Sequence, residues 1–312
     1  MKGWLFKEIH EPLELVERDD PQPGPGQIAI DIKAAGLCHS DVGLMEGITT
    51  SQLAFYPIII GHEFAGIVYA VGEGVTDFKV GDRVACRAGY GSPGVSMDGA
   101  YATKTVAPAM YCTIVPDDVP WMQAAAATDA GLTAYHAVAK TAGIKAGDRV
   151  GIVGVGGLGM NAVQAALALG AEVYISTRKA EVREKVLSMG CKGAVASPEE
   201  LAEFQLDTII DFAGFENTIL GSLKALKHGG TFVLIGLGSP SVTLDVTQFV
   251  CSEFTVKTSI GGTVEDLREV LKLIQEKKME IMASPITFDE IPEGLERLKQ
   301  GKVVGRLVAL ID

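Results

Sequence analysis

A glycine-rich turn is the stretch of this sequence best suited to bind a phosphate. A short apolar run at residues 150–153 precedes the turn, and a helical pattern and a second apolar run at residues 173–175 follow it. Together they form a β-α-β unit of about 30 residues, the length that a dinucleotide-binding unit needs. Glycines let the backbone turn sharply and approach a pyrophosphate, and the N-terminus of the helix offers unpaired N–H groups. We therefore predict dinucleotide binding rather than a merely structural turn, by Gly154, Gly156, Gly157, Leu158 and Gly159.

The residues after the second apolar run indicate which dinucleotide is bound. NAD-binding units usually place Asp or Glu there, to accept hydrogen bonds from the ribose 2′-hydroxyl. This chain instead has Ser176, Thr177, Arg178 and Lys179. An acid would repel a 2′-phosphate, whereas hydroxyls and cations would hold one, the arginine through a forked, charge-assisted contact. We predict NADP(H) in preference to NAD(H); the alternative is a solvated basic turn that opens the next helix.

A second group of chemically capable residues lies in the first third of the chain. Cys38, His62 and Glu63 are all possible zinc ligands. Their spacing is too loose for a zinc finger. Taken alone, a single cysteine is more often a buried core residue and a single histidine more often a hydrogen-bonded polar residue than a metal ligand.

Composition sets the broad class. The 312 residues suit two domains, the 47% of hydrophobic residues allows sizeable cores, and the net charge of −12 argues against nucleic-acid or anionic-membrane binding. The N-terminus lacks the apolar core of a signal peptide, and no apolar run is long enough to span a membrane. The five cysteines are scattered without a CxxC pair, which argues against a disulfide framework. We expect a cytoplasmic protein that acts on a small molecule.

The periodicity of the apolar residues changes near residue 122. Before it, alternating apolar residues predict strands at 27–33, 64–71, 82–86 and 100–106. After it, helical and strand patterns alternate to about residue 260, with further strands at 208–212 and 231–235, which is typical of a parallel sheet covered on both faces. Residues 263–277 then predict an amphipathic helix. The fold class is therefore α/β.

A series of motifs makes the chain resemble the zinc-dependent alcohol dehydrogenases of the medium-chain dehydrogenase/reductase superfamily. The resemblance runs nearly from end to end. It implies a GroES-like β-rich catalytic domain at 1–125 and 261–312, a Rossmann NADP(H)-binding domain at 126–260, and a catalytic zinc in the cleft between them. The motifs lie at residues 36–41 (GLCHSD), 61–66 (GHEFAG), 80–84 (VGDRV), 98–102 (DGAYA), 129–133 (DAGLT), 154–159 and 305–306.

The resemblance also implies roles for single residues. Cys38 and His62 match two zinc ligands, and Asp41 matches the carboxylate that orients the histidine. Ser40 matches the hydroxyl that takes the alcohol proton, and Glu63 the acid beside the metal, which binds it transiently or stays behind the ligands. Cofactor contacts are implied for His39 and Arg306 at the pyrophosphate and for Thr133 at the nicotinamide.

The sequence departs from the family pattern at three places. The third zinc ligand is often Cys, but Asp129 stands there; carboxylate is a fair zinc ligand, so we expect it to bind the metal, the alternative being a helix-start residue and a lost zinc. Gly43 replaces a histidine that extends the proton relay. The lobe that binds a structural zinc through four cysteines is reduced to residues 86–97 with Cys86 alone, so we predict one zinc per chain and a plain buried thiol at Cys86.

These expectations define a reaction and two rivals. The reaction is reversible interconversion of a primary or secondary alcohol with its aldehyde or ketone, by zinc-assisted hydride transfer to or from NADP(H). One rival is a zinc-free quinone or enone reductase on the same fold. The other is a non-catalytic NADPH-binding protein. We also expect a homodimer or homotetramer.

Overall fold

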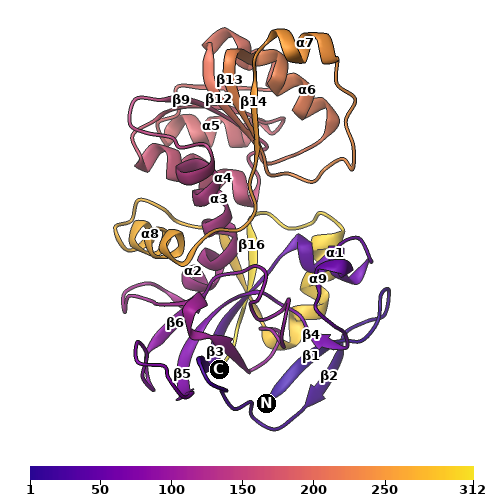
Figure 1. Cartoon of the computed structure of the whole chain (residues 1–312), viewed down its shortest axis with the longest axis vertical. Coiled ribbons are helices and arrows are strands. Elements are labelled where there is room, and N and C mark those ends of the chain that lie inside the picture. Colours follow the sequence, from indigo (N-terminus) through magenta and orange to yellow (C-terminus); the bar gives the residue numbers. More distant parts are fainter. The chain divides into compact units, whose positions relative to one another are not determined.

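The computed structural model of the chain describes residues 1–312, which form two compact units (Figure 1). Unit 1 comprises Met1–Leu132 and Gly261–Asp312, and unit 2 comprises Thr133–Ile260. The first boundary lies later than the predicted 125/126, inside a continuous helical segment. The reason is packing: a side chain at Gly131 would collide with Val270 and Ile281, so this turn of helix belongs to the core of unit 1. Asp129 is therefore part of unit 1 and not the start of the second domain.

Unit 1 is built on two sheets. A three-stranded sheet has the order β2-β1-β4, and a seven-stranded sheet has the order β15-β16-β3-β5-β6-β8, with β7 also paired to β3. All pairs are antiparallel except that of β15 and β16. The strands are β1 (Lys2–Phe6), β2 (Glu14–Glu17), β3 (Gln27–Leu37), β4 (Ile58–Ile59), β5 (Glu63–Val71), β6 (Arg83–Cys86), β7 (Lys104–Pro108), β8 (Cys112–Ile114), β15 (Ala283–Thr287) and β16 (Arg306–Leu310).

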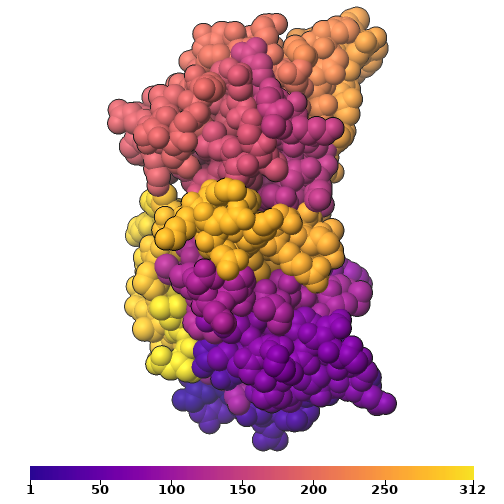
Figure 2. Space-filling view, turned by 90° about the vertical axis from the view of Figure 1, so that its left-hand side faces the viewer, coloured from indigo at the N-terminus to yellow at the C-terminus, as the bar shows by residue number.

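The long strand β3 organises this sheet. Ile28, Ile30 and Ile32 alternate along it and are fully buried in the core of the unit. The C-terminal strand β16 pairs with the end of β3, Leu307 opposite Leu37, so the last strand of the chain completes a sheet that begins at residue 27. Figure 2 shows the yellow C-terminal residues against the indigo and purple N-terminal ones. The sequence strands 27–33, 64–71 and 82–86 are found here, but the pairing of these strands could not be read from the sequence.

Helices lie around the sheets of unit 1. Helix α9 (Ile291–Lys299) packs beside α1 (His39–Met45) (Figure 1). Helix α8 begins after Thr263, whose hydroxyl accepts the backbone N–H of Asp266 while the Asp266 carboxylate accepts the backbone N–H of Thr263. This capping box fixes the start of the amphipathic helix that the sequence predicts at 263–277. The helices are α1 (His39–Met45), α2 (Trp121–Ala126), α8 (Val264–Gln275) and α9 (Ile291–Lys299), with short turns η1 (Thr50–Gln52), η2 (Ala109–Tyr111), η3 (Ala127–Gly131) and η6 (Phe288–Glu290).

Unit 2 contains a six-stranded, wholly parallel sheet of order β11-β10-β9-β12-β13-β14. The order reverses on either side of β9, which is the Rossmann arrangement. Its elements are α3 (Leu132–His136), η4 (Ala137–Thr141), β9 (Arg149–Val153), α4 (Gly157–Ala168), β10 (Glu172–Ser176), α5 (Ala180–Ser188), β11 (Gly193–Val195), η5 (Pro198–Phe204), β12 (Leu206–Asp211), α6 (Glu216–Ala225), β13 (Leu226–Leu234), α7 (Val246–Cys251) and β14 (Thr255–Thr258).

Both faces of this parallel sheet are covered at its central strand, β9. On β9, Ile152 packs into the cluster that contains Ala162 and Val163 of α4, whereas the next residue, Val153, packs into the opposite cluster with Leu223 of α6. Successive residues of a strand point to opposite faces, so a strand with helices on both sides reads as a continuous apolar run. The α/β fold class, with a GroES-like part and a Rossmann part, is thus confirmed. None of the helices combines the length and the hydropathy that a membrane-spanning segment needs.

Asp211 at the end of β12 predicts a local stability effect. Its carboxylate accepts the backbone N–H groups of Ala213 and Gly214 and the Thr218 hydroxyl, at 2.8, 3.0 and 2.7 Å, and the residue is fully buried. Asp211→Ala removes the charged acceptor of the buried Gly214 N–H and of two half-buried donors, so we expect a loss of about 2–3 kcal/mol in the free energy of unfolding. Denaturant titration would measure it. The exposed Asp207→Ala, which removes only a surface ion pair to Lys227, should change stability by less than about 1 kcal/mol, and an equal loss in both variants would contradict the prediction.

Candidate active site

The ends of three strands of unit 1 converge where the candidate ligands lie. Cys38 follows directly after β3, His62 directly precedes β5, and Arg306 opens β16. The register of the sheet aligns these points, because Gly36 lies opposite Glu63 and Leu37 opposite Leu307. Residues that are far apart in the sequence therefore meet at one end of the sheet.

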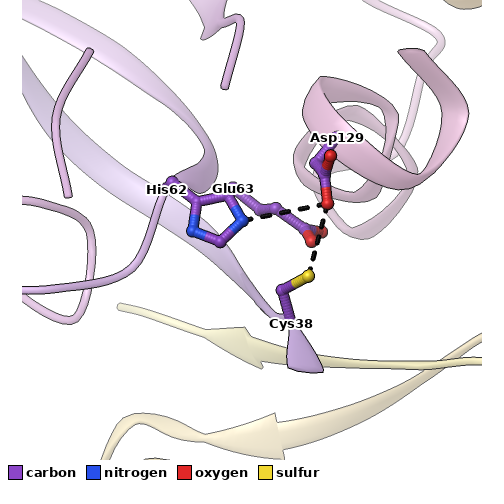
Figure 3. Close-up of side chains that lie close together, drawn as sticks. All are labelled: Cys38, His62, Glu63 and Asp129. Atoms are coloured by element: carbon purple, nitrogen blue, oxygen red, sulfur yellow. Dashed lines mark hydrogen bonds and ion pairs between the residues drawn. The ribbon is translucent and has the colours of Figure 1, made fainter. Parts of the chain in front are cut away.

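Four potential metal ligands gather there. Figure 3 shows Cys38, His62, Glu63 and Asp129 pointing toward one another. One ligand atom from each lies within 4.8 Å of every other. Asp129 comes from the η3 turn, which is π-helical, an irregularity that often re-aims a side chain at functional sites. The set joins a thiol, an imidazole and carboxylates, the donors that zinc prefers.

The distances between the ligand atoms fit a zinc ion. The Cys38 Sγ lies 3.4 Å from the Asp129 Oδ2, and the His62 Nε2 lies 3.8 Å from the same oxygen. Ligand atoms bound at ordinary zinc distances in a tetrahedral site lie about 3.3–3.6 Å apart. Little movement would therefore bring Cys38, His62 and Asp129 to binding distance of one ion.

A hydrogen bond to Asp41 fixes the orientation of the His62 ring. Its Nδ1 lies 3.1 Å from the Asp41 Oδ1, so Nδ1 carries the proton and Nε2 faces the ligand cluster. Asp41 is itself buried and accepts the backbone N–H of Cys38 at 3.1 Å. Burial alone would lower the pKa of His62, but the carboxylates of Asp41 and Asp129 outweigh it and raise that pKa well above its usual value. The Asp41 and Asp129 carboxylates therefore flank the imidazole on its two nitrogens.

Glu63 adds a buried acid behind the ligands. Burial raises the pKa of its carboxyl to about 8, against the opposing charge of Arg306. The Arg306 Nη2 lies 3.2 Å from the Glu63 Oε1 and 3.6 Å from the Asp129 Oδ2. Both Glu63 oxygens are buried, and the Arg306 guanidinium is their charged partner. A side chain at Gly36 would collide with Glu63, which explains that glycine. The predicted contact of Arg306 with a cofactor stays a prediction; within unit 1 the guanidinium faces these two acids.

Helix α1 places the remaining polar residues of the GLCHSD motif. Ser40 and His39 are exposed in its first turn, and the Ser40 Oγ lies 3.4 Å from the His62 Nε2. The serine hydroxyl is therefore beside the ligand cluster and open to solvent, from where it could pass a proton to water. A side chain at Gly43 would come within 3.1 Å of the Thr49 Oγ1, so this position has little room for a larger residue.

The short segment at 86–97, which replaces the structural-zinc lobe, packs on the backbone next to His62. A side chain at Gly94 would come within 2.3 Å of the Gly61 carbonyl oxygen and 3.0 Å of the His62 backbone nitrogen. Cys86 is buried and faces Cys112 across β6 and β8. The segment itself contributes no further cysteine, so the prediction of one zinc per chain stands as a prediction.

The glycine turn of unit 2 has the geometry that each glycine was expected to provide. Gly154 has a φ of +81°, and a side chain at Gly159 would lie 2.2 Å from the Gly154 carbonyl oxygen, so the helix packs tightly on the strand. Nothing lies within 4 Å of a side chain built at Gly156, which leaves its backbone open to a ligand. Helix α4 begins at Gly157 and directs its first N–H groups to the same place. The turn therefore fits a pyrophosphate.

The end of β10 carries the residues predicted to choose the cofactor. Ser176 is buried, whereas Arg178 and Lys179 are exposed just before α5. The structure adds a residue that the sequence reasoning missed: Arg183 donates from its Nη1 to the Thr177 carbonyl oxygen at 2.7 Å. Its position one turn into the predicted helix was the only available signal. Two arginines, Arg178 and Arg183, thus follow this strand closely in the sequence.

Tyr101 is a second residue that the sequence reasoning left without a role. In the sequence it stands out only as part of the DGAYA motif. Its hydroxyl donates to the Asp41 Oδ2 at 2.6 Å, and the side chain is fully buried. Burial and the nearby Asp41 charge raise the pKa of the Tyr101 hydroxyl well above its usual value, so it remains a donor at neutral pH.

Comparison with known proteins agrees with this geometry. Residues 24–117 match the family described as alcohol dehydrogenase GroES-like domain, and residues 157–276 match the zinc-binding dehydrogenase family. The chain is 31% identical to an alcohol dehydrogenase of Geobacillus stearothermophilus and 33% identical to one of Moraxella sp., each over 99% of this chain and 98% of the relative. It is 29% identical to an acryloyl-coenzyme A reductase of Sulfurisphaera tokodaii, over 99% of both chains.

Solved structures are similar over the same extent. A cobalt- and zinc-bound thermostable alcohol dehydrogenase from Pyrobaculum aerophilum matches with a TM-score of 0.87 and 28% identity, over 99% of both chains. Acetophenone reductase from Geotrichum candidum, in complex with NAD, matches with a TM-score of 0.85 and 30% identity, over 99% of this chain and 96% of that one. With both family domains and full-length relatives matched, the chain belongs to the zinc-type alcohol dehydrogenases of the medium-chain dehydrogenase/reductase superfamily.

Proposed function

We propose that this protein is a zinc-dependent oxidoreductase that interconverts a primary or secondary alcohol and its aldehyde or ketone with NADP(H). The observation that carries the proposal is the convergence of the Cys38 thiol, the His62 Nε2 and the Asp129 carboxylate. Membership of the alcohol dehydrogenase family supports the reaction type. Zinc would act as a Lewis acid on the substrate oxygen, and NADP(H) would carry the hydride.

The residues around the ligands have complementary roles in this reaction. Asp41 holds the His62 ring so that Nε2 faces the ligand cluster. Ser40 is the candidate to accept the alcohol proton, because its exposed hydroxyl lies beside that nitrogen. With Gly43 in place of a relay histidine, the proton would leave Ser40 to water or to a ribose hydroxyl rather than to an imidazole.

In unit 2, the proposed cofactor site follows the strand ends. The first N–H groups of α4 and the open backbone of Gly156 would bind the pyrophosphate. Arg178 and Lys179 at the end of β10, without an acid among residues 176–179, support a 2′-phosphate and hence NADP(H). We keep His39, Thr133 and Arg306 as proposed cofactor contacts.

A second candidate follows from one relative. Acryloyl-coenzyme A is an activated alkene, so the Sulfurisphaera tokodaii protein belongs by its name to a different substrate class. The corresponding activity here would be the enone reduction considered from the sequence. A zinc-free reductase would have no use for three converging ligands, and this favours the alcohol reaction.

Metal content tests the proposal directly. Elemental analysis of the purified chain should give about one zinc per chain, because the structure gathers one set of ligands. Removing the zinc with a chelator should abolish alcohol oxidation and carbonyl reduction with NADP(H), and added zinc should restore both. Two firmly bound zinc ions, or full alcohol oxidation and carbonyl reduction by metal-free protein, would contradict the proposal. Enone reduction by metal-free protein would favour the rival function.

A further inference from the structure

Tyr101 is held rigidly next to the His62 turn. Its backbone N–H donates to the Ile60 carbonyl at 3.0 Å, and its carbonyl accepts the N–H of Trp4 at 2.7 Å. The aromatic ring packs directly on Gly61: a side chain built there would come within 2.5 Å of the ring. Gly61 also has a φ of +92°, a conformation that favours glycine. The tyrosine therefore supports the backbone of the residue that precedes His62.

The Tyr101 hydroxyl also reaches the carboxylate that orients His62. The two oxygens of Asp41 have separate partners: Oδ1 faces the His62 Nδ1 at 3.1 Å, while Oδ2 accepts Tyr101 at 2.6 Å and the Cys38 N–H at 3.1 Å. The tyrosine contact is the shortest of the three. Donors on Oδ2 set the plane of the carboxylate, and that plane determines the direction of Oδ1.

We propose that Tyr101 is a positioning residue for the metal site, which fixes the His62 imidazole through Asp41. The proposal rests on zinc binding by Cys38, His62 and Asp129. A ligand held in place before the ion binds loses little freedom on binding and is slow to swing away. Without the hydroxyl, Asp41 would be anchored on that side by the Cys38 N–H alone, and His62 would leave the ion more easily.

The test is the rate at which zinc is lost to a coloured chelator. In Tyr101→Phe the ring remains on Gly61 and only the hydroxyl is lost, so the fold should persist. We expect zinc release about tenfold faster than in the wild type. This is the lower end of the effect on metal binding that follows from mutating residues that hydrogen-bond to metal ligands. Tyr69→Phe is the matched control, because its hydroxyl donates to the Pro21 carbonyl elsewhere in unit 1. It should leave the release rate unchanged.

Two further measurements separate positioning from general stabilisation. In an Asp41→Asn background, Tyr101→Phe should no longer change zinc release. The carboxylate through which Tyr101 acts on His62 is already absent there. The unfolding midpoint of the zinc-free proteins reports structural damage alone. Unchanged zinc release in Tyr101→Phe, or an undiminished effect in the Asp41→Asn background, would overturn the proposal. A wild type that binds no zinc would overturn the proposed function as well, so the two failures are distinguishable.

Discussion

Asp129→Asn is expected to lose zinc and, with it, turnover. The Asp129 Oδ2 lies within 4 Å of the Cys38 Sγ, the His62 Nε2 and the Arg306 Nη2. It is therefore at the centre of the ligand cluster. Asparagine keeps the size of the side chain but removes the charge that a zinc ligand provides. Mutating residues that only hydrogen-bond to metal ligands typically lowers metal affinity by about 10- to 100-fold. For the loss of a ligand itself we expect a decrease of about 100-fold in zinc affinity. Zinc occupancy after dialysis, measured with turnover, would show it.

Asp129→Cys is the complementary variant. It introduces the ligand more common in the family and should retain zinc, although thiolate is softer and changes the metal's Lewis acidity. Asp98→Asn is the matched control, because Asp98 accepts the Ile59 N–H and pairs with Arg18 away from the cluster. It should keep its zinc. If Asp129→Asn also kept full zinc and a near-normal rate, Asp129 would be structural and Glu63 would become the third ligand.

The parts of the fold that depend on local periodicity were predictable. The glycine turn, the strands beside it and helix α4 lie within a few residues of their predicted positions, because strand, turn and helix signals follow one another along the chain. In unit 1, by contrast, β1, β2 and β4 were not predicted, and the predicted strand 100–106 corresponds to β7 at Lys104–Pro108. Short strands carry few residues, and their pairing partners are distant in sequence.

The candidate site shows the same division. The sequence supplied ligand types, but the grouping of Cys38, His62 and Asp129 came from the family resemblance. Its geometric basis is the register of β3 with β5 and β16 and the π-helical turn that carries Asp129. The Tyr101–Asp41 hydrogen bond depends on that long-range packing as well. No local pattern encodes a contact between residues so far apart in the sequence. The hydrogen bonds that orient the metal ligands therefore depend on the fold.

Arg178→Asp is expected to reverse the cofactor preference. The wild type should use NADP(H) better than NAD(H), since the end of β10 offers the exposed cations Arg178 and Lys179 and no acid. Aspartate removes a charge-assisted contact and adds repulsion of the 2′-phosphate, while it supplies the carboxylate that accepts a ribose 2′-hydroxyl. Since one hydrogen bond to a charged group contributes about 1.5–3 kcal/mol, the ratio of kcat/KM for the two cofactors should shift by about 100-fold.

The measurement is kcat/KM for NADP(H) and NAD(H) in each variant. Lys185→Asp is the matched control, because it makes the same change of charge at the other end of α5 and should leave the ratio unchanged. Arg183 remains in Arg178→Asp, held by the Thr177 carbonyl, so some NADP(H) use should persist. The acetophenone reductase with bound NAD shows that the superfamily includes proteins that bind the other cofactor, so family membership does not decide the preference. A wild type that prefers NADH would show that residues 176–179 form a solvated basic turn.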